Sequence, residues 1–139
     1  MEIRKVALIL PHNENLEILF QNRKKIMKQY TKDYGFFGGK IEEGETVEQA
    51  LAREVMEELE IDIKKLENLE FFKRFDLENK ELDIGAELNV FLCKMPDLDN
   101  LKCNEGKPRV INLSDALNLN ISPWDKQILA EIQEHLKSK

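Results

Sequence analysis

The chain has 139 residues, 42% of them hydrophobic, and its 27 acidic and 21 basic residues give a net charge of −6 at pH 7. This length and apolar content suit one domain with a single core, so we expect a single domain over residues 1–139. The negative charge argues against binding of a nucleic-acid polymer through the overall field of the molecule. A small anionic substrate is still allowed where a cation stands between it and the carboxylates.

The cysteines and the first residues of the chain indicate a cytoplasmic protein. Cys93 and Cys103 lie in unlike contexts and have no short-spaced partner, so neither a disulfide framework nor a zinc site is expected. The apolar run before Pro11 is shorter than the core of a signal peptide or a membrane span. We therefore expect a cytoplasmic protein with reduced thiols and no membrane partner, either a monomer or a homodimer.

The predicted elements begin with a β-hairpin. Residues 6–10 and 17–21 are apolar runs of strand type, and the polar residues 11–15 between them favour a turn. Residues 21–34 are rich in Lys and Arg and indicate an exposed loop. The sequence leaves open whether the basic part of this loop, residues 23–32, contacts a substrate.

A helix over residues 46–60 comes next. Thr46 followed by Gln49 fits a capping box, in which the two side chains satisfy backbone amides that the first turn leaves free. Because successive residues of a helix are about 100° apart, its apolar residues gather on one side. This core face consists of Val47, Ala50, Leu51, Val55 and Leu59.

The second half of the chain supplies more strands and then helices. Residues 67–76 and 82–93 are rich in β-branched and aromatic residues and are expected to pair as long strands. Residues 108–113 predict a short strand, and residues 114–119 and 124–136 have helical patterns. The fold class that follows is α/β, with a mixed β-sheet between helices.

Three glutamates of the helix over residues 46–60 lie where a solvated face is not expected. Glu58 falls in the middle of the apolar sector, Glu54 falls beside it, and Glu57 lies at its rim. Their spacing places like charges next to one another, which destabilises the helix unless something positive is present. A hard cation, Mg²⁺ or Mn²⁺, satisfies this requirement, and so does pairing with Arg or Lys.

The glycines before this helix strengthen the metal interpretation. Gly38, Gly39 and Gly44 permit backbone conformations that Cβ-bearing residues avoid, and they allow a ligand or the helix to approach closely. On their own, they are equally compatible with a tight turn between a strand and a loop.

The stretch from Gly39 to Ile61 resembles the Nudix hydrolase box, which has a glycine, a glutamate and then R-E-U-x-E-E-x-G-U, with U a bulky aliphatic residue. The matching positions are Gly39, Glu45, Arg53, Glu54, Val55, Glu57, Glu58 and Ile61. The one departure is Glu60, where the pattern has a glycine that ends the helix in a left-handed conformation. Because no carboxylate position is affected, we expect a changed helix exit and an intact site.

This resemblance implies a Nudix-type α/β/α sandwich and a hydrolase of nucleoside diphosphates linked to another group. It implies that Glu54, Glu57 and Glu58 coordinate Mg²⁺ or Mn²⁺, that Arg53 orients this cluster, and that Glu45 supports the loop and the helix. Bound metal ions screen the phosphates and lower the pKa of the attacking water. The sequence does not decide which group accepts the proton of that water.

Further likenesses point to mutator-type Nudix enzymes. The segment NEGKP resembles a loop that adds a glutamate near the metal, which makes Glu105 a candidate, although an exposed turn glutamate is nearly as well supported. In SPWDK, Asp125 matches a position that contacts a purine, although it is equally well explained as a first-turn residue of a helix. Trp124 or Phe37 is a candidate for stacking on the base, with Trp124 in the core as the alternative.

The segment FFGGK with EGET resembles hydrolases that remove oxidised purine nucleotides. The substrate-binding candidates are therefore Phe37, Gly38, Gly39, Lys40 and Asp125, with a solvated loop lysine as the alternative for Lys40. The expected reaction converts a nucleoside triphosphate, such as 8-oxo-dGTP, to the monophosphate and pyrophosphate. A dinucleoside polyphosphate or nucleotide-sugar hydrolase is the alternative enzyme, and a Nudix domain that only binds a nucleotide is the alternative outside catalysis.

Overall fold

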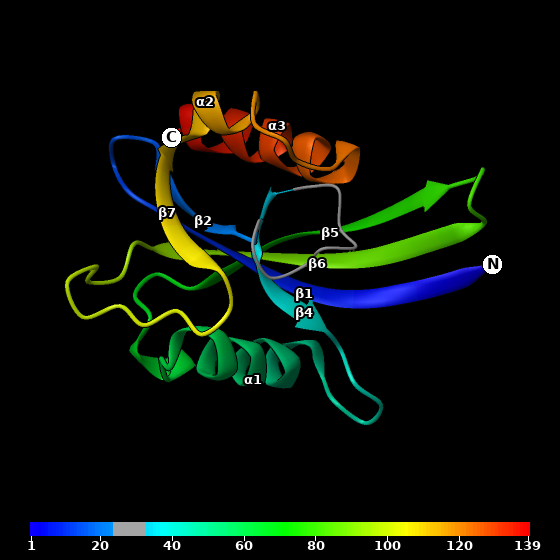
Figure 1. Cartoon of the computed structure of the whole chain (residues 1–139), viewed down its shortest axis with the longest axis horizontal. Coiled ribbons are helices and arrows are strands. Elements are labelled where there is room, and N and C mark those ends of the chain that lie inside the picture. The colour runs from blue at the N-terminus through cyan, green and yellow to red at the C-terminus, as the bar shows by residue number, and fades with distance from the viewer. Residues whose placement is uncertain (24–32) are drawn as a thin grey trace.

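A mixed β-sheet runs through the middle of the protein, with helices on both of its faces (Figure 1). This computed structural model describes residues 1–23 and 33–139. The strands are β1 (Glu2–His12), β2 (Glu17–Asn22), β3 (Tyr34–Gly35), β4 (Phe37–Lys40), β5 (Glu70–Asn79), β6 (Ile84–Lys94) and β7 (Lys107–Asn112). The helices are α1 (Val47–Leu59), the short 3₁₀ turn η1 (Ile63–Lys65), α2 (Leu113–Ala116) and α3 (Pro123–Lys137).

The strand order is β3-β2-β1-β6-β5, with β4 also paired to β1 and β7 to β2. β1 lies parallel to β6 along its whole length, from Glu2 opposite Ile84 to His12 opposite Lys94. Helix α1 covers one face of the sheet, and α2 and α3 cover the other (Figure 1). The predicted α/β class and α/β/α sandwich are therefore confirmed. Among the described residues, no helix has the length and apolar content needed to cross a membrane.

Each face of the sheet has its own core. The core under α3 contains Phe20, Leu88, Val90, Ile128 and Leu129, among other residues. The core under α1 contains Ala50, Leu51, Val55 and Leu59, as the helical pattern predicts, while Val47 is partly buried beside them. The sequence pattern therefore identified the buried face of α1 correctly.

Of the two interpretations of the glycine segment, the structure supports close approach to the helix and rules out the turn. The segment FGGK forms strand β4, which pairs antiparallel with β1 from Val6 opposite Lys40 to Ile9 opposite Phe37. A Cβ at Gly38, whose φ is +132°, would overlap the carbonyl oxygen of Ala7. Glycine is therefore required there because the two backbones approach closely.

Other predicted elements need smaller corrections. The hairpin of β1 and β2 is confirmed as an antiparallel pair, with His12 opposite Ile18. β5 and β6 pair antiparallel as predicted. Helix α2 has four residues and ends at Ala116, so the helix predicted over residues 114–119 is too long and one residue late. Of the basic segment 23–32, only Arg23 falls within the described residues.

The end of α1 differs from the expected one. Glu60 is its C-terminal cap, with φ 54° and ψ 38°, so it adopts the left-handed conformation that a glycine has in the Nudix pattern. The expectation of a changed helix exit was therefore wrong, because the glutamate accepts the strained conformation. Its side chain is exposed and lies 3.7 Å from Lys102, an ion pair of little value in water.

Replacement Glu60→Gly is expected to stabilise the protein. A left-handed conformation costs a residue with a Cβ roughly 1 kcal/mol, so the midpoint of thermal unfolding should rise by roughly 3 °C. Glu60→Ala is the matched control, because it removes the same ion pair and keeps the Cβ. Circular dichroism melts that place the glycine variant at or below the alanine variant would contradict the strain assigned to Glu60.

Candidate active site

Helix α1 lies against β4, and this contact positions two of the three glutamates. The backbone N–H of Gly38 donates a hydrogen bond to Glu58 Oε1 at 2.8 Å. A Cβ at Gly39 would lie 2.5 Å from the Glu54 carboxylate oxygen Oε1, so this carboxylate occupies the space that the glycine leaves. The glycine pair of β4 therefore holds the acidic side chains of α1 directly against the strand.

These two glycines have separable roles that substitution will test. Gly39→Ala would push aside the Glu54 carboxylate, the end of a flexible side chain, so we expect kcat/KM to fall about tenfold to a hundredfold with thermal stability nearly unchanged. Gly38→Ala would press on the backbone of β1 at a positive φ and should lower stability itself. Equal losses of stability in both variants would contradict this assignment.

Glu58 is the most buried charged group of the site. Its residue is 1% exposed, and burial raises the pKa of its carboxyl to about 8. The charges of Glu105 and Glu54 raise this pKa further, whereas the Gly38 N–H and the charge of Arg23 oppose the shift. A carboxyl in this state gains from a nearby cation, because a positive charge favours its ionised form.

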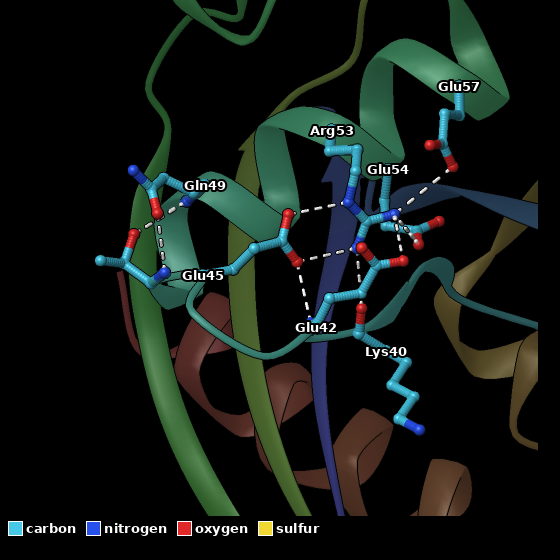
Figure 2. Close-up of polar contacts among 8 residues, drawn as sticks. Lys40, Glu42, Glu45, Gln49, Arg53, Glu54 and Glu57 are labelled. Carbon is cyan, nitrogen blue, oxygen red and sulfur yellow. Dashed lines mark hydrogen bonds and ion pairs between the residues drawn. The ribbon is translucent and has the colours of Figure 1, made fainter.

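Arg53 holds the neighbouring carboxylates in place, as Figure 2 shows. Its Nη1 donates to Glu54 Oε1 at 2.8 Å, and its Nη2 donates to the carbonyl oxygen of Lys40 at 2.9 Å. Its Nε and Nη2 reach both carboxylate oxygens of Glu45, at 2.8 and 3.0 Å. These hydrogen bonds lower the pKa of Glu45 to about 2, and the fork geometry fixes helix, strand and loop together.

The same network defines the surroundings of Glu54 and Glu57. Burial raises the pKa of Glu54, and the hydrogen bond from Arg53 works against this shift. Glu57 lies at the rim of the site, as its place on the helix predicts: its side chain is 57% exposed and 3.5 Å from Arg53 Nη1 (Figure 2). Glu54 and Glu58 thus form the inner part of the site and Glu57 the outer part.

Glu105 is brought to these glutamates by the loop between β6 and β7. Asn104 caps the end of α1: its backbone N–H donates to the Glu58 carbonyl at 2.7 Å, and its side-chain amide donates to the Glu57 carbonyl at 2.8 Å. Gln21 of β2 donates to the Glu105 carbonyl at 2.5 Å. The charge of Glu105 raises the pKa of both Glu54 and Glu58. The loop therefore adds a fourth carboxylate to the group.

The structure changes the roles expected for the FGGK segment. Phe37 has no exposed surface and packs in the core under α1, so the prediction that it stacks on a base is wrong. Gly38 and Gly39 position Glu58 and Glu54. The Lys40 carbonyl accepts from Arg53, while its exposed side chain points away from the cluster (Figure 2).

Asp125 lies at the start of α3, on the other side of the sheet from α1. Its backbone N–H donates to Ser122 Oγ at 3.0 Å, which caps the helix. Burial raises the pKa of its carboxyl to about 6, against the charge of Arg23 and a hydrogen bond with Ser122. Trp124 is partly buried against the core under α3. Asp125 therefore has a structural role in α3 as well as a buried, titratable carboxyl.

Arg23 is a functional candidate that the sequence did not single out. Its charge lowers the pKa of both Glu58 and Asp125, so it links the glutamate cluster to the start of α3. Its guanidinium lies in the space that a Cβ at Gly35 would fill. Among the described residues, its Nε is buried without a hydrogen-bond partner. In the sequence, Arg23 is one of several basic residues in a row, and no pattern distinguishes it from the others.

The donor set of the cluster fits a hard divalent cation. Glu54, Glu58 and Glu105 offer carboxylate oxygens, the ligands that Mg²⁺ and Mn²⁺ prefer, and burial of Glu58 makes a positive charge favourable. Within residues 1–23 and 33–139, no three His, Cys, Asp or Glu side chains already surround one point as metal ligands. Glu54 is held by Arg53 and Glu58 by Gly38 through one carboxylate oxygen each, Oε1 in both cases.

Comparison with known proteins identifies the family. A sequence profile described as NUDIX domain matches residues 2–132. Similar solved structures include the MutT protein of Methanosarcina mazei Go1, with 20% identity, a TM-score of 0.74 and coverage of 99% of this chain and 97% of the other. The dihydroneopterin triphosphate pyrophosphohydrolase of E. coli has 20% identity, a TM-score of 0.68 and coverage of 93% and 92%.

A C. elegans Ap4A hydrolase has 16% identity, a TM-score of 0.70 and coverage of 100% of both chains. No curated protein sequence matches the chain. Identities at this level show a shared fold, and the profile match over nearly the whole chain shows the family. Nudix hydrolases act on small nucleotide-type substrates and generally use divalent metal ions. The chain belongs to the Nudix family, as a hydrolase of phosphorus anhydrides.

Proposed function

We propose that this protein is a Mg²⁺-dependent pyrophosphohydrolase that converts a nucleoside triphosphate to the nucleoside monophosphate and pyrophosphate. The observation that carries the proposal is the group of four carboxylates, Glu54, Glu57, Glu58 and Glu105, which two separate segments of the chain bring together around β4. A site with this charge binds a polyphosphate only with cations between the two.

Glu54, Glu57 and Glu58 are the proposed ligands of Mg²⁺ or Mn²⁺, and Glu105 adds a carboxylate from the loop between β6 and β7. When bound, the metal neutralises charge on the phosphates and lowers the pKa of the attacking water. Arg53 limits the motion of Glu54 by its hydrogen bond at 2.8 Å, and Glu45 in turn fixes Arg53. Such supporting residues commonly change metal affinity or activity about 10- to 100-fold when they are replaced.

Selection of the base is proposed to involve Asp125 and Arg23. An ionised carboxylate accepts hydrogen bonds, as the ring N–H and amino group of a guanine edge require, whereas a protonated carboxyl donates one. Burial raises the pKa of Asp125 to about 6, so both forms are accessible near neutral pH. Arg23 has a buried Nε–H donor without a partner among the described residues, and its charge acts on both Asp125 and Glu58. This arrangement supports a purine triphosphate, such as 8-oxo-dGTP, as the substrate.

Hydrolysis of a dinucleoside polyphosphate is the second candidate, and the similarity in fold to an Ap4A hydrolase favours it. The two reactions share the metal chemistry and differ in the group beyond the phosphates. Binding without turnover is disfavoured because all the box glutamates are present. The distinction must therefore come from substrate comparison.

The test is a comparison of kcat/KM in Mg²⁺ for dGTP, 8-oxo-dGTP, the common triphosphates, ADP-ribose and diadenosine tetraphosphate. The proposal predicts the highest value for a purine triphosphate. Asp125→Ala should reduce the preference among bases, with Lys126→Ala, an exposed neighbour, as the control. Turnover of diadenosine tetraphosphate or ADP-ribose alone would keep the Nudix chemistry and overturn the triphosphate assignment.

A further inference from the structure

β5 is the outer strand at one edge of the sheet. Within the described part of the chain it pairs with β6 and with no other strand. Figure 1 shows that β5 and β6 extend together beyond the ends of both covering helices. An outer strand presents a row of unpaired backbone N–H and C=O groups, and these groups can pair with a strand of another chain.

The side chains of β5 divide between the two faces of the sheet. Arg74 and Asp76 lie on the α1 face, 53% and 64% exposed, and Arg74 Nε donates to Asp76 Oδ1 at 3.1 Å. Phe75 between them points to the α3 face and is buried there, 3% exposed. Lys73 also points to the α3 face, where it pairs with Glu131 of α3 at 2.6 Å. On the α1 face, Arg74 and Asp76 therefore flank the central Phe75, and Glu78 follows Asp76. Arg74 also pairs with Glu87 of β6 at 3.2 Å.

We propose that β5 pairs antiparallel with β5 of a second copy of this chain, around a two-fold axis at Phe75. A two-fold axis perpendicular to the sheet joins α1 face to α1 face, so residues opposite each other must belong to the same face. With Phe75 opposite its own copy, Arg74 faces the partner's Asp76, and Asp76 faces the partner's Arg74. The two sheets then form one continuous sheet that contains two cross-strand ion pairs.

The charges specify this register against its neighbours. Because residues opposite each other must lie on the same face, every allowed register places one residue of β5 opposite its own copy on the two-fold axis. The alternatives to Phe75 are therefore registers with a neighbouring residue on the axis. An axis at Arg74 places two arginines opposite each other, and an axis at Asp76 places two aspartates opposite each other. The axis at Asp76 also brings Arg74 opposite the partner's Glu78, whereas the axis at Phe75 forms its two Arg–Asp pairs with no like charges opposite each other. The bulge between Phe71 and Lys73 interrupts the pairing of β5 near its N-terminal end. The register around Phe75 is therefore the favourable one.

This pattern differs from the usual protection of an edge strand. Charged side chains commonly keep edges apart because like charges meet when two copies approach. In β5, Arg74 and Asp76 instead lie opposite residues of opposite charge when two copies pair antiparallel around Phe75. The partner of this surface is thus a second copy of the chain, held by backbone hydrogen bonds and by two Arg–Asp pairs.

Sedimentation equilibrium of the full-length chain over a wide concentration range tests the proposal. The wild type should be a dimer whose dissociation constant rises with ionic strength. Arg74→Asp and Asp76→Arg each replace two attractive pairs by two repulsive ones, so each should raise the dissociation constant at least about tenfold. The double variant Arg74→Asp/Asp76→Arg restores opposite charges and should recover the dimer.

Lys65→Asp is the matched control, because it reverses a charge on η1, an exposed turn outside the sheet, and should leave the dimer unchanged. Circular dichroism melts of all variants separate loss of the dimer from loss of the fold. A wild-type monomer at every concentration would overturn the proposal. A double variant that is folded but remains monomeric would overturn the proposed register.

Discussion

Glu58→Gln is expected to abolish turnover while the protein keeps or gains thermal stability. The Gln amide oxygen can still accept from the Gly38 N–H, and the side chain has the same shape, so the packing under β4 is preserved. Without metal, the Glu58 carboxyl keeps its proton up to a pH of about 8, so the neutral Gln side chain resembles this form. At higher pH, Gln also avoids the repulsion of an ionised Glu58 by Glu54 and Glu105. The change also removes a proposed metal ligand, and loss of one preorganised electrostatic group costs on the order of 10²–10³ in kcat.

Two measurements are needed, kcat/KM in saturating Mg²⁺ and the midpoint of thermal unfolding in EDTA. Glu43→Gln is the matched control, because Glu43 is an exposed glutamate between β4 and α1, and both quantities should stay at wild-type values. An active Glu58→Gln variant with much lower stability would contradict the role assigned to Glu58, since it would make this residue a structural group.

In the absence of metal, the free energy of unfolding is expected to fall as the pH rises from about 6.5 to about 8. Burial raises the pKa of Glu58 to about 8, so the folded protein keeps a proton that an unfolded chain, with a Glu pKa near 4.3, has already released. A raised pKa in the folded state stabilises at low pH, and this stabilisation is lost as the pH rises through that value. The expected slope approaches a loss of about 1.4 kcal/mol per pH unit.

Other groups with a shifted pKa contribute mainly at lower pH. The pKa of Glu45 is lowered to about 2, so its contribution is lost only in strong acid, and the pKa of Asp125 is raised to about 6, so Asp125 acts mainly below the interval. Burial lowers the pKa of His12 below 6.5, which gives a contribution of opposite sign at the lower end of the interval. Urea unfolding at several pH values in EDTA measures the slope, and Glu58→Gln is the control in which it should be nearly flat. A slope that is the same in both proteins would show that the buried carboxyl of Glu58 does not cause it.

The part of the site that lies on α1 was predictable because a helix has a fixed geometry. Thr46 and Gln49 located the start of the helix, and the spacing of the apolar residues located its buried face. From these two facts the burial of Glu58 and the rim position of Glu57 follow without any tertiary information.

The parts that failed depend on contacts between distant segments. The FGGK segment forms a strand because β1 pairs with it, and Phe37 is buried because it packs in the core under α1. The residues within the FGGK segment do not indicate either of these contacts. Arg23 stands out only in the folded protein, where its charge lowers the pKa of both Glu58 and Asp125. Glu60 keeps the left-handed helix exit because the packing of the whole domain outweighs a strain of roughly 1 kcal/mol.

The most direct test of the proposed chemistry is to identify the products of dGTP hydrolysis by the wild-type protein, with Mg²⁺ and with EDTA. The proposed site predicts dGMP and pyrophosphate in equal amounts in Mg²⁺ and no turnover in EDTA, because the carboxylates act on the phosphates only through a cation. Release of inorganic phosphate with dGDP, or undiminished turnover in EDTA, would contradict a metal-dependent pyrophosphohydrolase built on Glu54, Glu58 and Glu105.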